Sequence, residues 1–220
     1  GFPLSAALVE RELRIAQGTV VGCNHALEHG IAFNIAGGTH HAFSDRGEAF
    51  CLLNDQAIAA QYLINQKKCH KILIVDLDVH QGNGTAEIFQ NNADVITFSM
   101  HGQSNYPFRK ETSDYDIALP DKTDDTTYLS ILQETLPELL NIHRPDFVFY
   151  LAGVDILGTD KLGKLGCTLE GCKTRDSYVL GLCKSLGIPV QVSMGGGYSP
   201  AIKTIIEAHA NTYRVARALY

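Results

Sequence analysis

Acidic and imidazole side chains alternate within one short segment of this sequence. The segment Asp76-Leu77-Asp78-Val79-His80 directly follows the apolar run 72–75. A period of two places Asp76, Asp78 and His80 on one face of an extended chain. Two carboxylates on one face repel each other unless a cation or a proton lies between them. With the added imidazole, this set favours zinc or another divalent metal over a carboxylate pair that caps neighbouring helices.

A third metal ligand must come from elsewhere, because a catalytic zinc typically has three protein ligands and an open position for water. Asp78 and His80 supply two of them. Asp155 is the best candidate for the third, since it follows the apolar run 147–152 and an unpaired carboxylate would be costly to bury there. Taken by itself, Asp155 would be interpreted as an N-cap of the segment that follows.

Two glycine-rich segments lead into side chains that can move or donate protons. His40 and His41 follow Gly37-Gly38 by one residue, and adjacent histidines on a loop can act as a proton shuttle and its electrostatic partner. Gly195-Gly196-Gly197 ends in Tyr198, whose phenol can donate a hydrogen bond to a developing oxyanion. A phosphate-binding loop is the alternative, but no Lys-Ser/Thr follows and the spacing is not GxGxxG.

Alternating strands and helices must position these side chains. Apolar runs predict strands at residues 71–75, 94–100, 116–119, 146–152 and 189–194, and residues 19–23 and 30–35 are further short apolar stretches. Helical periodicity and capping residues predict helices over 8–17 with Gly18 as the stop, 54–64, 85–89, 125–140, 170–186, and 199–219 with Ser199 as N-cap and Pro200 at the first position.

This order predicts a three-layer α/β fold in which a mostly parallel sheet has helices on both faces, because strands that are apolar on both sides need two covers. Chemistry in such sheets collects beyond the carboxyl ends of the strands, where all four polar segments lie. We expect one domain over residues 1–220, since no internal repeat or linker interrupts the pattern.

The composition excludes several classes of protein. The 220 residues carry 18 Lys and Arg against 24 Asp and Glu, a net charge of −6, so we expect no direct binding of nucleic acid through its phosphates. No apolar stretch approaches the ~20 residues of a membrane span, and the first residues lack the pattern of a signal peptide. The six cysteines form no CxxC pair and predict reduced thiols in an intracellular, cytoplasmic protein, or a nuclear one in a eukaryote.

Over essentially its whole length, the chain resembles the histone deacetylase superfamily, closest to its class IV and bacterial relatives. The resemblance rests on five ordered motifs, which are Gly37-Gly38-Thr39-His40-His41-Ala42, Phe50-Cys51-Leu52-Leu53-Asn54-Asp55, Asp76-Leu77-Asp78-Val79-His80-Gln81-Gly82-Asn83-Gly84, Ala152-Gly153-Val154-Asp155-Ile156-Leu157 and Gly195-Gly196-Gly197-Tyr198. It implies the arginase/deacetylase-like version of the α/β fold. It also implies that the chain lacks an N-terminal segment that family members usually carry.

The resemblance assigns a role to each candidate residue. It implies one zinc ion held by Asp78, His80 and Asp155, with His41 as general base and acid, His40 as its electrostatic partner and Tyr198 polarising the scissile carbonyl. Asp76 and Asn83 would support these side chains from behind, and Asn83 stands where many deacetylases have Asp. A neutral partner stabilises an imidazolium less than a carboxylate does. The remaining implied positions are an acyl-lysine tunnel of Phe50, Tyr106, Leu162 and Gly196, and a structural potassium site of Asp76, Asp78, His80, Ser99 and Met100.

The function implied is zinc-dependent hydrolysis of the amide bond in acyl-lysine or a related acylated amine by metal-activated water. Histone, other protein, polyamine and small-molecule substrates remain open, as does the oligomeric state. One alternative is an arginase-like ureohydrolase with two manganese ions, although Gly82 stands where the last Asp of the DxHxD motif of that family would be. Another alternative is a non-catalytic module that binds acyl-lysine.

Overall fold

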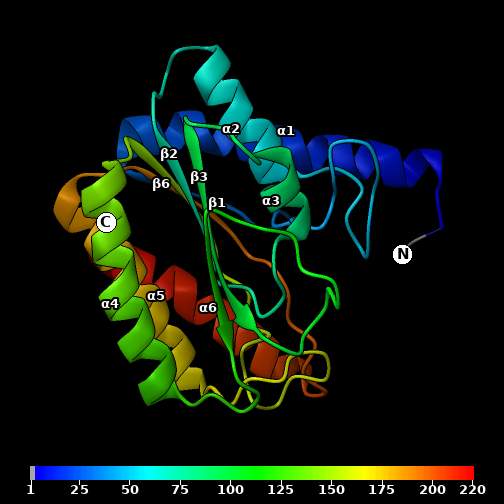
Figure 1. Cartoon of the computed structure of the whole chain (residues 1–220), viewed down its shortest axis with the longest axis vertical. Helices are drawn as coiled ribbons and strands as arrows, with labels where there is room; N and C mark the ends of the chain where they lie inside the picture. The colour runs from blue at the N-terminus through cyan, green and yellow to red at the C-terminus, as the bar shows by residue number, and fades with distance from the viewer. Residues whose placement is uncertain (1–2) are drawn as a thin grey trace.

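In the computed structural model, which describes residues 3–220, parallel strands form a six-stranded sheet in the order β1-β6-β5-β2-β3-β4 (Figure 1). The strands are β1 (Ile31–Asn34), β2 (Ile72–Asp76), β3 (Val95–Gly102), β4 (Tyr115–Leu119), β5 (Phe147–Leu151) and β6 (Val190–Ser193). Every neighbouring pair in this sheet is parallel, so all carboxyl ends lie at one edge.

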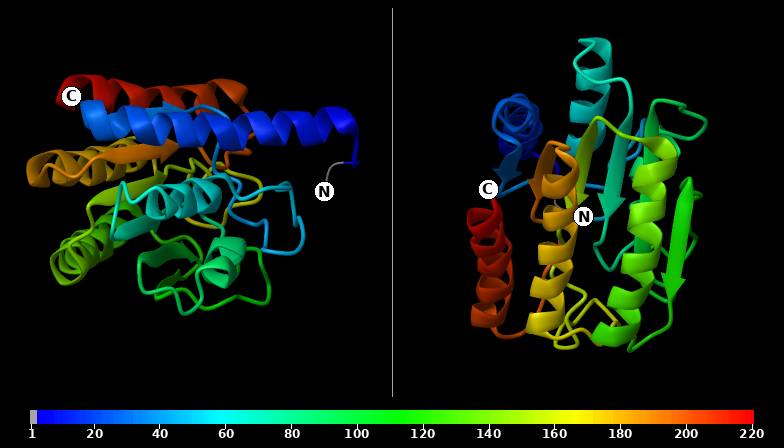
Figure 2. Two further views of the ribbon diagram at one scale, coloured as in Figure 1. Left: turned by 90° about the horizontal axis from the view of Figure 1, so that it is seen from above. Right: turned by 90° about the vertical axis from the view of Figure 1, so that its left-hand side faces the viewer.

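Helices cover both faces of the sheet. They are α1 (Ala6–His29), α2 (Asp55–Asn65), α3 (Asn83–Ile88), α4 (Asp125–His143), α5 (Leu169–Leu186) and α6 (Ile202–Leu219). The right-hand view of Figure 2 shows α4, α5 and α6 side by side on one face, in green, yellow and red. The helices α1 and α2 pack together against the other face. The three-layer α/β fold expected from the sequence is confirmed.

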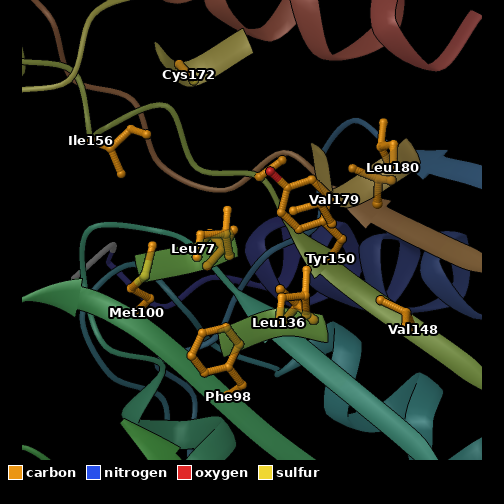
Figure 3. Packing of buried hydrophobic residues seen from close by; sticks show 14 of the residues in the cluster. Leu77, Phe98, Met100, Leu136, Val148, Tyr150, Ile156, Cys172, Val179 and Leu180 are labelled. Carbon is orange, nitrogen blue, oxygen red and sulfur yellow. The ribbon is translucent and has the colours of Figure 1, made fainter. Parts of the chain in front are cut away.

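Two hydrophobic clusters hold these layers together, one on each face. Along β2, Leu73 and Val75 join the cluster beneath α4, α5 and α6, whereas Ile72 and Ile74 join the cluster beneath α1 and α2. Figure 3 shows the larger cluster, where Phe98, Val148 and Tyr150 of the sheet lie near Leu136 of α4 and Val179 and Leu180 of α5. A strand such as β2, which is apolar on both faces, is therefore buried between two layers of helices, as its sequence predicts.

The first helix, with 24 residues, is more than twice as long as the sequence pattern predicts. The expected stop at Gly18 is wrong, since α1 continues to His29 and ends at Gly30, which has a left-handed φ of 90°. Gly18 instead lets α1 approach β1, because a Cβ at this position would lie 3.2 Å from Asn34 Nδ2. Residues 19–23, expected as a separate apolar stretch, belong to α1, and Thr19 and Cys23 lie on its buried face.

The start of the last helix is also corrected. Ser199 was expected to cap it and Pro200 to begin it, but α6 begins at Ile202 and its N-cap, Ala201, makes no side-chain hydrogen bond. The Ser199 hydroxyl is engaged elsewhere, 2.8 Å from Thr159 Oγ1. In contrast, Asn54 caps α2 as expected, since its side chain accepts a hydrogen bond from Ala57 N at 3.1 Å.

Two expectations from composition can be compared with the structure. No helix within residues 3–220 is both long and apolar enough to cross a membrane. All six cysteines lie in the described part of the chain as free thiols, and five of them are buried.

A buried ion pair joins the sheet to the helices behind it. Arg175 of α5 is fully buried and donates hydrogen bonds from Nε and Nη2 to Asp176 Oδ1, at 2.9 and 2.8 Å. Its Nη1 donates to the carbonyl oxygens of Leu77 and Gly153, which extend from the ends of β2 and β5. Arg175 therefore holds the two segments that carry Asp78 and Asp155.

Replacing Arg175 with methionine should lower the free energy of unfolding by about 3–5 kcal/mol, because Asp176 would keep a buried charge without its partner. Urea unfolding followed by circular dichroism measures this. The control is Arg214→Met, because Arg214 is 57% exposed in its pair with Glu207 and should cost less than about 1 kcal/mol. Equal losses in the two variants would contradict the structural role of Arg175.

Candidate metal and catalytic site

The register of the sheet brings the polar segments together. In the pairing of β2 with β5, Asp76 lies opposite Leu151, so residues 77–80 and 152–155 leave the sheet side by side. The segment after β6 joins them, because Ala152 N donates to Ser193 O and Gly196 N donates to Asp78 Oδ2. Segments that are more than 100 residues apart in sequence, such as Asp78 and Gly196, thus meet at one edge, as expected for a parallel sheet.

Asp78, His80 and Asp155 form a group that could hold a metal ion, because one ligand atom from each lies within 4.8 Å of the others. His80 Nδ1 lies 3.0 Å from Asp78 Oδ1 and 3.2 Å from Asp155 Oδ2. Apart from this contact with His80, the buried Asp155 Oδ2 has no hydrogen-bond partner in the described part of the chain. Two carboxylate oxygens and one imidazole nitrogen fit zinc, and the incompletely satisfied oxygen of Asp155 is available as a ligand.

Gly196 is needed at this position because of its small size. A Cβ on Gly196 would lie 2.1 Å from Asp155 Oδ2, closer than any real contact. The backbone can therefore approach both carboxylates only without a side chain.

The charges of the group are tightly coupled. Burial, followed by the negative charge of Asp78, raises the pKa of Asp155 to about 7. Burial opposes the charged form of His80, but hydrogen bonds with Asp155 and Asp78 outweigh it and raise its pKa to about 10. Burial also opposes the charge on Asp78, yet contacts with His80 and His40 hold its pKa below the ordinary range. Without a cation, Asp155 and His80 therefore retain protons near neutral pH, whereas Asp78 is ionised.

His40 and His41 have different partners and therefore different charges. His40 Nδ1 lies 2.7 Å from Asp76 Oδ2, whereas His41 Nδ1 lies 2.7 Å from Asn83 Oδ1. Burial alone would lower the pKa of His40, but the Asp76 carboxylate raises it to about 9. Burial, followed by the positive charge of His40, lowers the pKa of His41 to about 3. His41 is therefore neutral at working pH and able to accept a proton.

Asp55, at the start of α2, shapes the loop that carries the histidines. Its Oδ1 accepts hydrogen bonds from Gly38 N, Thr39 N and Thr39 Oγ1, each at 2.9 Å, and its Oδ2 accepts one from Thr19 Oγ1. These bonds tie residues 37–39 to both α1 and α2. The loop is thus held by rigid helices immediately before the two histidines.

A cavity of about 550 Å³ opens beside the group. Its lining includes every expected catalytic and tunnel residue, together with two of the three candidate metal ligands, namely His40, His41, Phe50, Asp78, His80, Tyr106, Leu162, Gly196 and Tyr198. Asp155 is fully buried behind it. The three residues that the resemblance alone suggested for a tunnel, Phe50, Tyr106 and Leu162, lie on its wall, and Phe50 and Leu162 are partly exposed at 49% and 46%.

Tyr198 stands on the cavity wall, where its ring centroid lies 6.5 Å from that of His80 and 6.3 Å from that of Phe50. Asp160 fixes its backbone, because Asp160 Oδ2 accepts a hydrogen bond from Tyr198 N at 2.6 Å. Burial, followed by the charges of Asp78 and Asp155, raises the pKa of the phenol well above its usual value. The hydroxyl therefore keeps its proton and can donate it in a hydrogen bond.

The residues expected around a potassium ion lie behind this group. Asp76 Oδ1 accepts a hydrogen bond from Asp78 N at 3.1 Å, and Asp76 pairs with Ser99 across β2 and β3. The Ser99 hydroxyl lies 3.0 Å from His101 Nδ1, and the Met100 side chain is buried in the larger hydrophobic cluster (Figure 3). Met100 could therefore contribute only its backbone carbonyl, and the potassium site stays a prediction.

Two residues that the sequence analysis did not single out contribute to the site. Arg175 holds the backbone beside Asp78 and Asp155, and Glu48 accepts hydrogen bonds from Asn83 Nδ2 and the Tyr106 hydroxyl, at 2.8 and 2.5 Å. Neither has a signal in a single sequence, because Glu48 lies in a polar loop and Arg175 in a helix of mixed composition. Only the folded chain shows that these charges point inward.

Comparison with known proteins gives consistent results. Residues 1–213 match the model of a family described as the histone deacetylase domain. The chain is 48% identical over 220 residues to an uncharacterised protein of Picosynechococcus sp., of which it covers 73%. It is 31% identical over 192 residues to histone deacetylase 2 of Arabidopsis thaliana, and this match includes 86% of the chain and 50% of that protein.

A solved structure is similar over most of the chain. It is the crystal structure of acetylpolyamine aminohydrolase from Burkholderia pseudomallei, with a TM-score of 0.77 and 26% sequence identity. The match covers 93% of the present chain and 61% of that one. The chain thus spans about half the length of the Arabidopsis protein and less than two thirds of the solved structure.

Replacing Asp155 with alanine should abolish stoichiometric binding of a divalent metal, because it removes one member of the three-residue group that could hold the ion. Elemental analysis of the purified protein measures the metal content per chain. The control is Asp94→Ala, since Asp94 is exposed at the opposite edge of the sheet and should leave the metal content unchanged. Full metal content in Asp155→Ala would show that the ligand set is wrong.

The affinity for zinc should rise with pH between about 6 and 8, because metal must displace the protons that Asp155 and His80 otherwise retain. Each displaced proton contributes up to about a tenfold gain per pH unit. Competition with a chromophoric chelator at a series of pH values measures the affinity. An affinity that stays constant over this range would contradict the charge distribution described here.

Proposed function

The chain belongs to the histone deacetylase family, and from this premise we propose that it hydrolyses the amide bond of acyl-lysine or a related acylated amine with the aid of one zinc ion. The observation that carries the proposal is the buried Asp155 Oδ2, which has no hydrogen-bond partner among the described residues apart from its contact with His80, another member of the group. A purely structural carboxylate would have its hydrogen bonds satisfied within the protein.

Asp78, His80 and Asp155 would hold the zinc ion. A zinc ion bound there supplies Lewis-acid chemistry, which polarises the carbonyl of the substrate and makes water a better nucleophile. The cavity places Phe50 and Tyr106 as apolar walls next to this group, and an acyl-lysine side chain is long and mostly apolar. The walls would orient the amide and exclude bulk water from it.

His41 acts as the base that removes a proton from the attacking water. Its Nδ1 is occupied by Asn83, so Nε2 is the nitrogen left to accept that proton. Its low pKa keeps the ring neutral before the reaction. His41 then returns the proton to the nitrogen of the leaving amine, and His40, held by Asp76, supplies a neighbouring positive charge.

Tyr198 donates a hydrogen bond to the carbonyl oxygen as negative charge develops on it. The phenol is a suitable donor because its raised pKa keeps it protonated, and because Asp160 holds its backbone in place. A donor that is fixed in advance loses little freedom when the charge forms, so its contribution to the transition state is large.

An arginase-like site with two metal ions fits the structure less well. Within residues 3–220, Asp78, His80 and Asp155 form one group of metal-ligating side chains, and a second group is not found. At the position of the missing aspartate, a Cβ on Gly82 would lie 2.3 Å from Asp76 Oδ2, which leaves no room for a further ligand. A module that only binds acyl-lysine is disfavoured because the histidine pair and Tyr198 surround the same cavity.

The substrate class follows from similarity and not from a bound ligand. The related Burkholderia structure is named an acetylpolyamine aminohydrolase and the Arabidopsis protein a histone deacetylase, so acylated amines are the shared chemistry. The single domain over residues 1–220, the cytoplasmic location and the absence of nucleic-acid binding stay predictions, as does the N-terminal segment suggested by the resemblance.

Turnover by the purified protein tests the proposal directly. Peptides with acetyl-lysine and an acetylated polyamine should be hydrolysed by the zinc-loaded protein, and a chelator should abolish the reaction until zinc is restored. A zinc-loaded protein that binds these substrates without releasing the acyl group would overturn the hydrolase and support the binding module.

Replacing Tyr198 with phenylalanine should lower kcat by about two to three powers of ten, because one donor to the developing oxyanion is lost. The phenyl ring still packs beside Phe50 and His80, so the metal content should stay at the level of the unchanged protein. Steady-state kinetics with parallel zinc analysis measures both. Undiminished kcat at full zinc content would rule out a catalytic role for the phenol.

A further inference from the structure

We propose that Glu48 is a positioning residue that fixes the orientation of the Asn83 amide and, through it, the tautomer of His41. The inference rests on the proposed function, since it concerns the residue assigned there as the base. Neither the match to the family nor the group of metal-ligating side chains assigns this role to Glu48.

Glu48 is connected to His41 by a continuous chain of hydrogen bonds. His41 Nδ1 lies 2.7 Å from Asn83 Oδ1, and Asn83 Nδ2 donates to Glu48 Oε1 at 2.8 Å. The Tyr106 hydroxyl donates to the same Glu48 oxygen at 2.5 Å, and Arg46 Nε lies 3.7 Å from Glu48 Oε2. Two donors and a nearby guanidinium thus surround the carboxylate, while His41 and Asn83 themselves are buried.

The direction of each bond in this chain follows from what its members can do. An ionised carboxylate only accepts hydrogen bonds, so the amide nitrogen of Asn83 must face Glu48. The amide oxygen of Asn83 must then face His41, and this oxygen can only accept. His41 Nδ1 must therefore carry the hydrogen, which leaves the lone pair on Nε2.

The tautomer matters because only a nitrogen with a free lone pair can take a proton from water. An isolated asparagine does not impose this choice. If its side-chain amide were flipped by 180°, the NH2 group would face His41 Nδ1, and the imidazole would carry its hydrogen on Nε2 instead. That form of His41 cannot act as the base. An aspartate at this position would have no such ambiguity, because both of its oxygens accept.

A tight turn places Glu48 where it can serve this purpose. Glu48 N donates to Cys51 O and Cys51 N donates to Glu48 O, both at 2.9 Å, so only Ala49 and Phe50 lie between the paired residues. Ala49 has a left-handed φ of 51°, as one of the two residues within such a turn often requires. The backbone of Glu48 is therefore fixed at the base of the cavity wall that Phe50 forms.

A pair of substitutions separates this role from a general structural one. Glu48→Ala should lower kcat roughly 10- to 100-fold with little change in KM, as is typical when a group that orients an active-site residue is removed. Asn83→Asp should also lower kcat, because it places a second carboxylate against Glu48. The double variant Glu48→Ala/Asn83→Asp should be more active than either single variant, since the new carboxylate accepts from His41 Nδ1 without help from residue 48.

The tautomer itself provides a readout that does not depend on activity. Histidine labelled with nitrogen-15 distinguishes a protonated from an unprotonated ring nitrogen by its chemical shift, and comparison with His41→Ala assigns the signals of His41. In the unchanged protein, the hydrogen should reside on Nδ1. In Glu48→Ala a fraction should shift to Nε2, and in the double variant it should return to Nδ1.

The matched control is Glu87→Ala. Glu87 accepts hydrogen bonds from Ser44 N and Oγ, at 3.1 and 2.8 Å, and takes no part in the hydrogen-bond chain from Glu48 to His41. This variant should change neither kcat nor the His41 tautomer. All variants are compared at equal zinc content.

Two results would overturn the inference. The first is a hydrogen on Nε2 of His41 in the unchanged protein, a result that does not depend on the Glu48 and Asn83 variants. The second is a double variant with the kcat and tautomer of Glu48→Ala. A protein that lacks hydrolase activity but shows the expected tautomers would overturn the proposed function and leave the role of Glu48 intact.

Discussion

Two buried carboxylates at the ends of neighbouring strands are the constraint on which the site depends. Asp78 and Asp155 follow β2 and β5, whose parallel pairing forces them together. Their mutual repulsion in a medium of low polarity requires a proton or a cation nearby. His80, the glycine backbone after β6 and the Arg175 guanidinium behind the strands are all arranged around this requirement.

Two of the buried aspartates, Asp176 and Asp155, differ in how completely their hydrogen-bonding capacity is satisfied. Asp176 accepts hydrogen bonds from Arg175, Tyr150 and Thr212, so its charge is compensated within the protein. Asp155 Oδ1 accepts one from Val79 N, while its Oδ2 has no partner among the described residues apart from its contact with His80. A fully satisfied carboxylate holds the fold together, whereas an incompletely satisfied one retains the capacity to bind a ligand. The difference between the two is visible only from their surroundings.

The sequence was sufficient for β2 to β6, because strands that are apolar on both faces have few alternatives to burial between helix layers, whereas the segment of β1 was recognised only as a short apolar stretch. It was also sufficient to place Asp78, His80, Asp155 and Tyr198 at one edge. It failed at Gly18, where a residue that usually ends helices instead permits close contact with Asn34. It failed at Ser199, whose hydroxyl bonds to Thr159 and not to the helix.

Glu48 and Arg175 were missed for a different physical reason. Charged side chains are normally solvated, so a sequence pattern assigns them to the surface unless a motif says otherwise. Their inward direction depends on tertiary contacts, with Tyr106 and Asn83 in one case and with Leu77 and Gly153 in the other. Information of this kind does not reside in local periodicity.

The turn between Glu48 and Cys51 carries both a residue that lines the cavity and the carboxylate at the end of the His41 hydrogen-bond chain. The shape of the cavity and the position of this carboxylate therefore depend on the same backbone. Phe50 lies on the wall of the cavity, and Glu48 accepts a hydrogen bond from Asn83. A redesign that widens the cavity by remodelling this turn also moves the far end of the His41 hydrogen-bond chain. Under the proposed function, a smaller side chain at residue 50 would therefore widen the cavity with less effect on His41 than a change of the turn, since it leaves the Glu48 backbone in place.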